Sequence, residues 1–368
     1  MGADIGVIIP TVRDPSVIRR YAQNAIYHRF PLDRLEFIVL TEDFADKSKY
    51  QHEFEKMGLD GIVFDQSGRD EFLKSSGVER FAGIFPKQSH AETSFGIFYS
   101  WIREHKYDVL IDDDTFPLDT HDYFGEHLDN LEYSGTIAEA SSSSRWVNVL
   151  HKNFGRHRLY PRGYPYGAMN EVIRLEQKHI SKVVLSQGLW TNIPDLDAVR
   201  ILNDGDLNGQ SRTRTQESDY GPNFTVTRGN YTTVCSMNLA FKTLLAPAFY
   251  QFPMDDNPWK IGRFDDIWSG VVSKKICDTF GYSIVCGSPL CRHDKAPRST
   301  FRDLSAEAPG LQANEKFYGV VDSARGDGNS IADMVDSIAT KLEGSDHEFI
   351  RYCGTYTKKW LELLECFD

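Results

Sequence analysis

The sequence predicts an α/β fold in which helices flank a mostly parallel central sheet. Short apolar runs alternate with amphipathic helical segments over roughly the first third of the chain, and this alternation is typical of parallel strands joined by helical crossovers. With 368 residues, 40% of them hydrophobic, the chain is long enough to bury a sizeable core. The chain has a net charge of -12, whereas a nucleic-acid-binding protein usually has an excess of basic residues, so we expect no nucleic-acid partner.

Four apolar runs are predicted to be the strands of the sheet: residues 5–9, 35–40, 61–64 and 107–111. Residues 16–28 and 92–105 have the apolar spacing of helices, and Ser16 is expected to cap the first of them. Each strand ends in polar or acidic residues. Oxygen-bearing side chains are therefore expected at one edge of the sheet, where open α/β folds bind ligands.

The second half of the chain is less regular. Residues 139–144 are small and polar and are predicted to form a loop, whereas residues 182–185 are predicted to form a short strand. Residues 202–230 form a long polar segment, which is either a functional lid or a surface insertion.

Apolar side chains recur at helical spacing near the end of the chain, so we expect two amphipathic helices there, over residues 331–342 and 349–363. We predict a main domain over residues 1–300. Residues 301–368 are predicted to be a helical extension that packs on this domain or forms a subunit interface.

No basic segment followed by a long apolar run opens the chain, and no apolar run approaches the length of a membrane span. The six cysteines are scattered, without the spacing of a zinc site. Free thiols in a reducing compartment are therefore expected, and a cytoplasmic location with them.

Three consecutive aspartates, Asp112, Asp113 and Asp114, follow the strand at residues 107–111. Because alternate residues of a strand point the same way, Asp112 and Asp114 are expected to face one site and Asp113 to point away from it. Two carboxylates held close repel each other unless a positive charge lies between them. A divalent cation that carries a nucleotide diphosphate supplies such a charge, and a solvated acidic turn is the alternative.

Two further segments carry candidate binding residues. Arg162, next to Gly163, offers a planar charged fork that suits phosphate oxygens. Trp190 and Asn192 lie in a segment that mixes an aromatic side chain, polar groups and turn-forming residues, as in a loop that faces a sugar.

Two acidic residues and one histidine are the remaining candidates. Asp265 and Asp266 precede an apolar helical stretch, so they are either charges that stabilise a helix N-terminus or catalytic carboxylates. His293, in the segment His293-Asp294-Lys295, is a weak candidate when considered alone, because a lone histidine is usually structural or solvent-facing.

Taken in order, these segments resemble the reversibly glycosylated polypeptides, a family that includes the UDP-arabinopyranose mutases. The resemblance extends over roughly residues 5–300. It is carried by residues 8–11, 111–114, 162–165, 188–195, 236–241 and 263–270, and by His293 with Lys295-Ala296. Residues 202–230 and the tail after about residue 301 do not resemble the plant members, so segments that shape sugar specificity are expected to differ.

The resemblance implies a glycosyltransferase-type α/β fold of the GT-A kind, with a metal-binding Asp-x-Asp motif. Asp112 and Asp114 match that motif and would hold Mn²⁺ or Mg²⁺, and His293 falls where such folds often place a further ligand. Arg162 matches the arginine that the family associates with mutase activity and reversible self-glycosylation.

The resemblance also implies nucleotide contacts from the loop after the first strand, and a ribose or uracil contact from Glu42 or Asp43. The residues expected to contact the nucleotide sugar are Pro10, Thr11, Arg13, Glu42, Asp43, Asp113, Trp190 and Asn192.

The expected activity is therefore a metal-dependent interconversion of the pyranose and furanose forms of a UDP-sugar, UDP-arabinose above all. Arg162 would stabilise the diphosphate or an oxocarbenium-like state, and Asp265 and Asp266 would act in acid–base catalysis or trap the sugar. A glycosyltransferase that uses an external acceptor is the alternative, and a non-catalytic self-glycosylating subunit is a third possibility. A homo-oligomer is expected. No Gly-x-Gly-x-x-Gly motif is present, so no flavin is expected.

Overall fold

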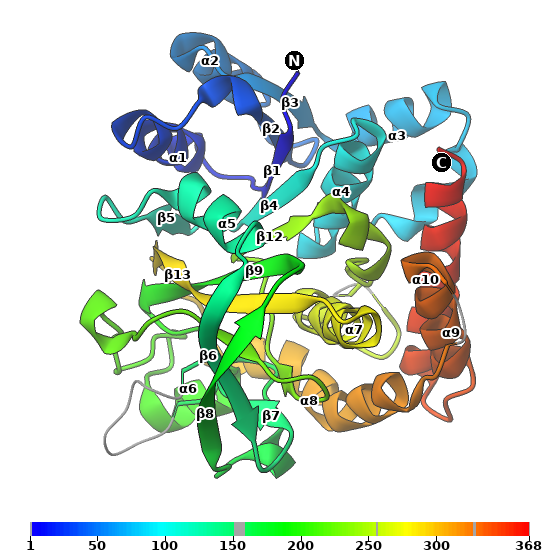
Figure 1. Ribbon diagram of the computed structural model, residues 1–368. Helices are drawn as coiled ribbons and strands as arrows, with labels where there is room; N and C mark the ends of the chain where they lie inside the picture. Colours follow the sequence, from blue (N-terminus) through cyan, green and yellow to red (C-terminus); the bar gives the residue numbers. More distant parts are fainter. Residues whose placement is uncertain (1, 151–158, 255–256, 327–328, 368) are drawn as a thin grey trace.

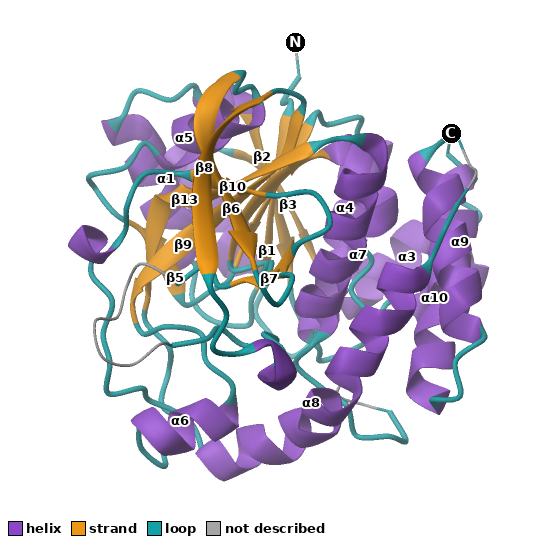
Figure 2. Ribbon diagram, turned by 60° about the horizontal axis from the view of Figure 1, so that its bottom comes forward, coloured by secondary structure: helices purple, strands orange, loops and turns teal. Residues whose placement is uncertain are grey.

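The structure of the protein is a computed structural model, and it describes residues 2–150, 159–254, 257–326 and 329–367. One eleven-stranded mixed sheet runs through the centre of the molecule (Figure 1). Helices α1 (Ser16–Tyr27) and α5 (Tyr123–Leu131) lie on one face of this sheet, and α4 (Thr93–Ile102) and α7 (Asp265–Phe280) lie on the other (Figure 2). The α/β class with flanking helices is thus confirmed.

The first four strands are parallel and lie in the order β3-β2-β1-β4. They are β1 (Ile5–Pro10), β2 (Leu35–Leu40), β3 (Asp60–Phe64) and β4 (Tyr107–Ile111). All six residues of β2 are buried, as expected for a parallel strand covered by helices on both faces. The four predicted strands are therefore confirmed, and the carboxyl ends of β1 and β4 lie side by side.

The helices between these strands are α1, α2 (Ser48–Met57), α3 (Gln66–Ser75) and α4. Ser16 begins α1 but does not cap it, so this prediction is wrong. The cap position is Pro15, and the backbone N–H of Ser16 donates to Asp14 at 2.8 Å. The helix therefore starts at the expected cap residue itself, and the cap position lies one residue earlier, in the proline-containing turn.

Beyond β4 the sheet is mixed rather than mostly parallel. Strand β12 (Asn238–Lys242) runs antiparallel to both β4 and β9 (Val183–Asn192), and β13 (Ser283–His293) runs parallel to β9. The sheet continues through β10 (Phe224–Val226) and β6 (Gly135–Ser142) to β8 (Ile173–Ile180), while β5 (Thr115–Pro117) pairs with β13. The carboxyl end of β13 reaches the same edge as the end of β4.

The predicted loop at residues 139–144 is wrong for residues 139–142, which belong to β6. This strand pairs with β8 over eight residues and with β10 over three. Its side chains are small and mostly half-buried, so they show no apolar alternation. Backbone pairing with distant strands, rather than a local pattern, makes this segment a strand.

The long polar segment at residues 202–230 is anchored to the body of the molecule. Helix α6 (Ala198–Asp204) ends in it, and the Asp204 carboxylate accepts hydrogen bonds from Ser211 and Thr213. Thr215 exchanges two backbone hydrogen bonds with Asn192 at the end of β9. The segment is therefore held at the end of β9, and its residues 224–226 form β10 of the sheet.

Three helices close the chain: α8 (Thr300–Ser323), α9 (Ile331–Glu343) and α10 (Glu348–Glu365). They pack on the main body. Phe317 of α8 stacks on Trp268 of α7 with ring centroids 4.2 Å apart, and Trp360 of α10 donates to the Ala246 carbonyl at 3.2 Å. The proposed division at residue 300 stays a prediction.

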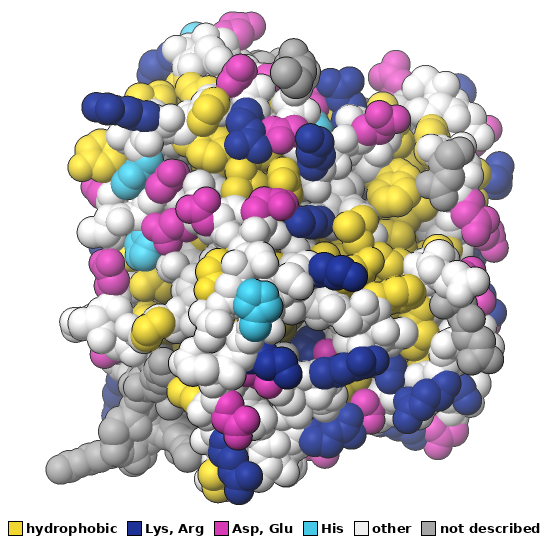
Figure 3. All heavy atoms as spheres, in the orientation of Figure 1, with side chains coloured by type: hydrophobic (Ala, Val, Ile, Leu, Met, Phe, Trp, Pro, Cys, Tyr) yellow, Lys and Arg dark blue, Asp and Glu magenta, His cyan; other side chains and the backbone are white. Residues whose placement is uncertain are grey.

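The surface carries charges of both signs. On the face drawn in Figure 3, acidic and basic side chains lie intermixed, with apolar side chains exposed between them. Among the residues that the structure describes, no helix has both the length and the apolar character needed to cross a bilayer.

Candidate functional site

A cavity of about 220 Å³ lies at the edge of the sheet where β1, β4 and β13 end and α7 begins. Charged side chains dominate its lining, which consists of Pro10, Arg13, His90, Asp112, Asp113, Asp114, Arg162, Asp195, Met237, Arg263, Asp265, Asp266, His293, Lys295 and Arg298. Nine of the predicted site residues are in this set. The edge location follows from the topology, because parallel strands end together on the side where each enters its crossover.

The three aspartates lie in the turn between β4 and β5, after the last residue of β4. The premise that Asp112 and Asp114 share a strand face while Asp113 points away is therefore wrong. A turn does not alternate its side chains as a strand does, and all three aspartates line the cavity.

Asp113 is the aspartate held most closely by the chain itself. Its carboxylate accepts a hydrogen bond from Thr11 Oγ1 at 2.8 Å and lies 3.3 Å from Arg13 Nε. Burial, with the neighbouring charges of Asp114 and Asp112, raises the pKa of Asp113 to about 6, although Arg13 and Thr11 oppose this shift. Crowding of three carboxylates in one turn is thus only partly compensated.

His293 ends β13 beside this turn. Its Nδ1 lies 2.7 Å from the Ile193 carbonyl and its Nε2 lies 3.8 Å from Asp114 Oδ1. A carbonyl can only accept, so Nδ1 carries the proton, and in the neutral ring the Nε2 lone pair is free.

The chemistry of Asp112, Asp114 and His293 fits Mn²⁺ or Mg²⁺, because two carboxylates and an imidazole offer oxygen and nitrogen donors to a divalent ion. Within residues 2–150, 159–254, 257–326 and 329–367, however, no three such side chains stand close enough to form a ready metal site. The ligand set stays a prediction.

His90 was not predicted, yet it links two groups of predicted residues. Its Nε2 lies 2.9 Å from Asp112 Oδ1 and its Nδ1 lies 3.0 Å from Asp265 Oδ2. Burial lowers the pKa of His90, but the two carboxylates outweigh this and hold it well above its usual value. His90 also lowers the pKa of Asp265 against the effect of burial. Its sequence neighbours form no recognisable motif, so no local signal identified it.

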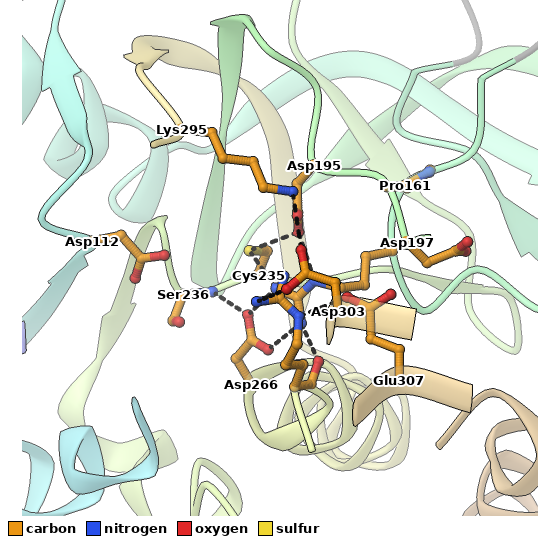
Figure 4. Close-up of polar contacts among 12 residues, drawn as sticks. Asp112, Pro161, Asp195, Asp197, Cys235, Ser236, Asp266, Lys295, Asp303 and Glu307 are labelled. Atoms are coloured by element: carbon orange, nitrogen blue, oxygen red, sulfur yellow. Dashed lines mark hydrogen bonds and ion pairs between the residues drawn. The ribbon is translucent and has the colours of Figure 1, made fainter. Parts of the chain in front are cut away.

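Arg162 is at the centre of a buried ion-pair network in the lining of the cavity, and Figure 4 labels its two acidic partners, Asp195 and Asp266. Its Nε donates to Asp195 Oδ2 at 3.0 Å, and its two terminal nitrogens lie 3.3 and 3.5 Å from the Asp266 carboxylate oxygens. It also donates to the Arg263 carbonyl. Burial opposes the charge of Arg162, but Asp195 and Asp266 raise its pKa well above the usual value. We call Arg162, Asp195 and Asp266 the arginine network.

The local backbone explains why Arg162 reaches α7. Gly163 has φ +82°, a left-handed conformation that glycine adopts without strain, and a Cβ there would lie 2.2 Å from Ile267 Cγ2 of α7. Asp265 and Asp266 form the first turn of α7 and also line the cavity. Both descriptions of this pair therefore apply: the two aspartates are charges at a helix N-terminus, and they are also carboxylates of the cavity.

A second group of charged side chains lies next to the arginine network. Arg263 Nε donates to Glu307 at 2.6 Å, and Arg298 Nε donates to Asp303 at 2.8 Å. Lys295 reaches toward this group, as Figure 4 shows, but its Nζ comes no closer than 3.9 Å to Asp303. Asp195 and Lys295 lie in segments that resemble the family, but they were not predicted as site residues because no local sequence pattern indicates a role for them.

A neighbouring pocket of about 300 Å³ shares Pro10, His90 and Asp113 with the cavity. It is also lined by Thr11 and Glu42, both predicted to contact the nucleotide, and by further residues that include Val12, Phe44 and Glu92. The pocket therefore continues the cavity toward the end of β2.

The buried acids of this second pocket share one arginine. Arg69 donates to Glu92 at 2.8 Å and lies 3.8 Å from Glu42. Burial raises the pKa of Glu92 to about 8, although Arg69 opposes the shift.

Three predicted residues lie outside the cavity and the second pocket. Asp43 accepts two hydrogen bonds from Ser67, at 2.8 and 3.0 Å. Trp190 is 1% exposed and belongs to the core, while Asn192 donates to Asp294 at 2.9 Å. Their roles as nucleotide-sugar contacts remain untested, and this structure gives them other partners or surroundings.

Comparison with known proteins identifies one family. A family model described as "Reversibly glycosylated polypeptide" matches residues 69–367. UDP-arabinopyranose mutase 1 of Arabidopsis thaliana is 30% identical, with 88% of this chain and 80% of the relative covered. UDP-arabinopyranose mutase 1 of rice (Oryza sativa subsp. japonica) is also 30% identical, covering 84% and 74%. The probable UDP-arabinopyranose mutase 1 of pea (Pisum sativum) is 26% identical, covering 98% and 91%.

Solved structures of glycosyl-transferring enzymes are more distant. Glucosyl-3-phosphoglycerate synthase of Mycobacterium tuberculosis, in complex with Mn²⁺, UDP-glucose and phosphoglyceric acid, matches with a TM-score of 0.41 and 13% identity over 88% of this chain and 83% of that one. A mannosyltransferase of Pyrobaculum calidifontis, in complex with GDP-mannose and Mn²⁺, matches with a TM-score of 0.37 and 12% identity, covering 99% and 86%.

Proposed function

The chain belongs to the reversibly glycosylated polypeptide family, and from this premise we propose that it is a metal-dependent UDP-sugar mutase. It interconverts the pyranose and furanose forms of a UDP-sugar, with UDP-arabinose as the first candidate. The single observation that carries the proposal is the cavity itself, which brings the acidic turn after β4 against the arginine network. Relatives named as UDP-arabinopyranose mutases match over most of their length, which supports the same reaction.

The reaction requires the bond between the anomeric carbon and the diphosphate to break and to form again. Asp112, Asp114 and His293 would hold Mn²⁺ or Mg²⁺, which stabilises negative charge on a diphosphate. Arg162 stays protonated, so it is not the nucleophile. Its charge, held beside the cavity by Asp195 and Asp266, stabilises an electron-rich leaving group and keeps the two carboxylates in place.

Proton transfer in this proposal belongs to Asp265 and His90. When the C4 hydroxyl of the pyranose attacks the anomeric carbon, the bond to UDP breaks and the hydroxyl proton passes to the Asp265 carboxylate. When UDP returns to that carbon, the bond to the former ring oxygen breaks and this oxygen takes the proton back from Asp265. His90 Nδ1 is 3.0 Å from that carboxylate, so the imidazole orients it and shares its charge. Asp266 is engaged by Arg162 and by the Ser236 N–H at 3.3 Å, which leaves Asp265 as the carboxylate for this step.

The proposal extends to the setting of the enzyme. Free buried cysteines suit a reducing cytoplasm, and five of the six are buried. We propose a cytoplasmic homo-oligomer that needs no flavin.

The test is incubation of the purified protein with UDP-arabinofuranose and Mn²⁺, followed by chromatography of the nucleotide sugars. Appearance of UDP-arabinopyranose supports the mutase. If no pyranose form appears from any of several UDP-furanoses, the proposed reaction is wrong.

A glycosyltransferase that uses an external acceptor is the second candidate. A groove of about 420 Å³ lies between the end of β9 and the anchored polar segment, lined in part by Asn192, Arg214 and Arg292. Such a groove suits an acceptor. Transfer or hydrolysis of the sugar without isomerisation favours this candidate over the mutase.

A further inference from the structure

Lys295 presents a positive charge to the cavity with only one distant carboxylate beside it. The residue is 7% exposed and lines the cavity two positions after His293. Its Nζ makes no hydrogen bond among the described residues, and the nearest carboxylate oxygen among them, Asp303 Oδ2, is 3.9 Å away. An ammonium that lines a cavity and makes no hydrogen bond with the protein can donate to an anionic or polar ligand.

Every other arginine or lysine of the lining has a closer carboxylate. The distances from guanidinium nitrogen to carboxylate oxygen are 3.3 Å for Arg13 with Asp113, 3.0 Å for Arg162 with Asp195, 2.6 Å for Arg263 with Glu307 and 2.8 Å for Arg298 with Asp303. Arg162 has an acceptor for each of its five N–H groups, the longest contacts being to Asp266 and Cys235. Among the lysine and arginine side chains of the lining, Lys295 is thus the one held least closely by carboxylates of the described residues.

The position of Lys295 indicates which part of the substrate it meets. The segment before it contacts the acidic turn, because the Asp294 N–H donates to the Asp114 carbonyl at 2.8 Å and His293 Nε2 lies 3.8 Å from Asp114 Oδ1. Figure 4 shows the Lys295 side chain directed from there toward Asp195 of the arginine network. In a UDP-sugar, the diphosphate lies between the uridine and the sugar, and its β-phosphate is the group that leaves the anomeric carbon. We propose that Lys295 binds the β-phosphate of the UDP-sugar through its Nζ. This inference rests on the proposed use of UDP-sugars, and it assigns to Lys295 a contact first expected of Arg162.

Comparison of UDP with UMP tests the assignment, because UMP lacks the β-phosphate. We suggest calorimetric titration of both nucleotides into the full chain in the presence of Mn²⁺, for the wild type and for Lys295→Met and Lys295→Arg. Loss of one charge-assisted hydrogen bond is expected to weaken UDP binding about tenfold in Lys295→Met. UMP binding stays within about twofold in the same variant, and Lys295→Arg retains part of the preference for UDP.

Lys178→Met is the matched control, since it removes one positive charge from an exposed position on β8, and it leaves both affinities unchanged. If Lys295→Met does not fold, Lys295→Gln takes its place, and retained UMP binding shows that the site is intact.

The inference is overturned if the ratio of UDP to UMP affinity in Lys295→Met equals that of the wild type, whether both affinities are retained or both fall. Failure of the wild type to isomerise UDP-arabinose, with UDP still bound more tightly than UMP, would refute the proposed function and leave this test valid.

Discussion

The acidic turn after β4 and the arginine network face one cavity, but their charges are compensated in different ways. The side chains of Asp112 and Asp114 are 24% and 18% exposed, and their basic neighbours His90 and Arg13 are 32% and 45% exposed. Arg162 and Asp266 are 9% and 4% exposed and bind each other. The ion pairs of the turn therefore stay open to a ligand, whereas the network is a fixed framework. Burial and ion pairing, rather than charge alone, distinguish side chains that are available to bind a ligand from side chains that hold other residues in place.

Removal of Arg162 should have the largest effect, because it breaks the framework. Arg162→Met leaves Asp195 and Asp266 buried without their cation, so we expect a loss of about 3–5 kcal/mol in the free energy of unfolding. Mutase activity should fall below detection. Urea denaturation followed by circular dichroism measures the first effect. Arg162→Lys, which keeps the charge but not the planar fork, should be intermediate. Wild-type stability in Arg162→Met would show that the network is not a framework.

Substitution in the acidic turn should separate activity from stability. We expect Asp112→Asn to lower the mutase rate about a hundredfold, since it removes one charge from the predicted metal site. The free energy of unfolding should change by less than about 1 kcal/mol, because the side chain is partly exposed. Rates measured over a series of Mn²⁺ concentrations, beside a thermal melt, check both points. Asp119→Asn, on the exposed surface beyond the turn, is the control. Equal losses in both variants would argue against a role for the turn.

Asp108 extends the comparison to a buried carboxylate with no cation close enough to pair with it. It lies on β4, neither of its oxygens has a hydrogen bond of normal geometry, and burial raises its pKa to about 7. An acid whose pKa is raised on folding stabilises the protein only when protonated, and this contribution is lost between about pH 4 and pH 7. We therefore expect Asp108→Asn to stabilise the protein by up to about 4 kcal/mol at pH 8, since each unit of pKa shift corresponds to about 1.4 kcal/mol, and by almost nothing at pH 4. Denaturation at both values is the measurement, and a gain that does not vary with pH would contradict the assignment.

The smallest effect is expected at Asp43, whose carboxylate is occupied by Ser67. Asp43→Asn should change the affinity for UDP by less than about twofold, as for most surface substitutions. Glu42→Gln, at the neighbouring position that lines the second pocket, should weaken it more. Calorimetric titration of the pair resolves the difference. A larger loss of affinity in Asp43→Asn than in Glu42→Gln would show that Asp43, rather than Glu42, contacts the bound nucleotide.

Several parts of the fold were predictable from local pattern. The four parallel strands and the C-terminal helices carry apolar runs or helical spacing that match burial in the structure. Strand β6 was missed because its small side chains are half-buried on both faces, so that only its pairing with β8 and β10 defines it. The capping of α1 was missed for a similar reason, since the preceding turn decides where the helix starts.

The sequence by itself placed three aspartates directly after a buried strand, and so at an edge of the sheet, but not in a turn. It also placed Arg162 and Asp265 among the candidates. Only the tertiary structure decided which charges are compensated. His90 meets Asp112 and Asp265 across 22 and 175 positions of the chain, and Arg162 meets Asp266 across 104. Such contacts depend on how strands and helices pack, which no local pattern records, and they leave Lys295 with no carboxylate of the described residues closer than 3.9 Å.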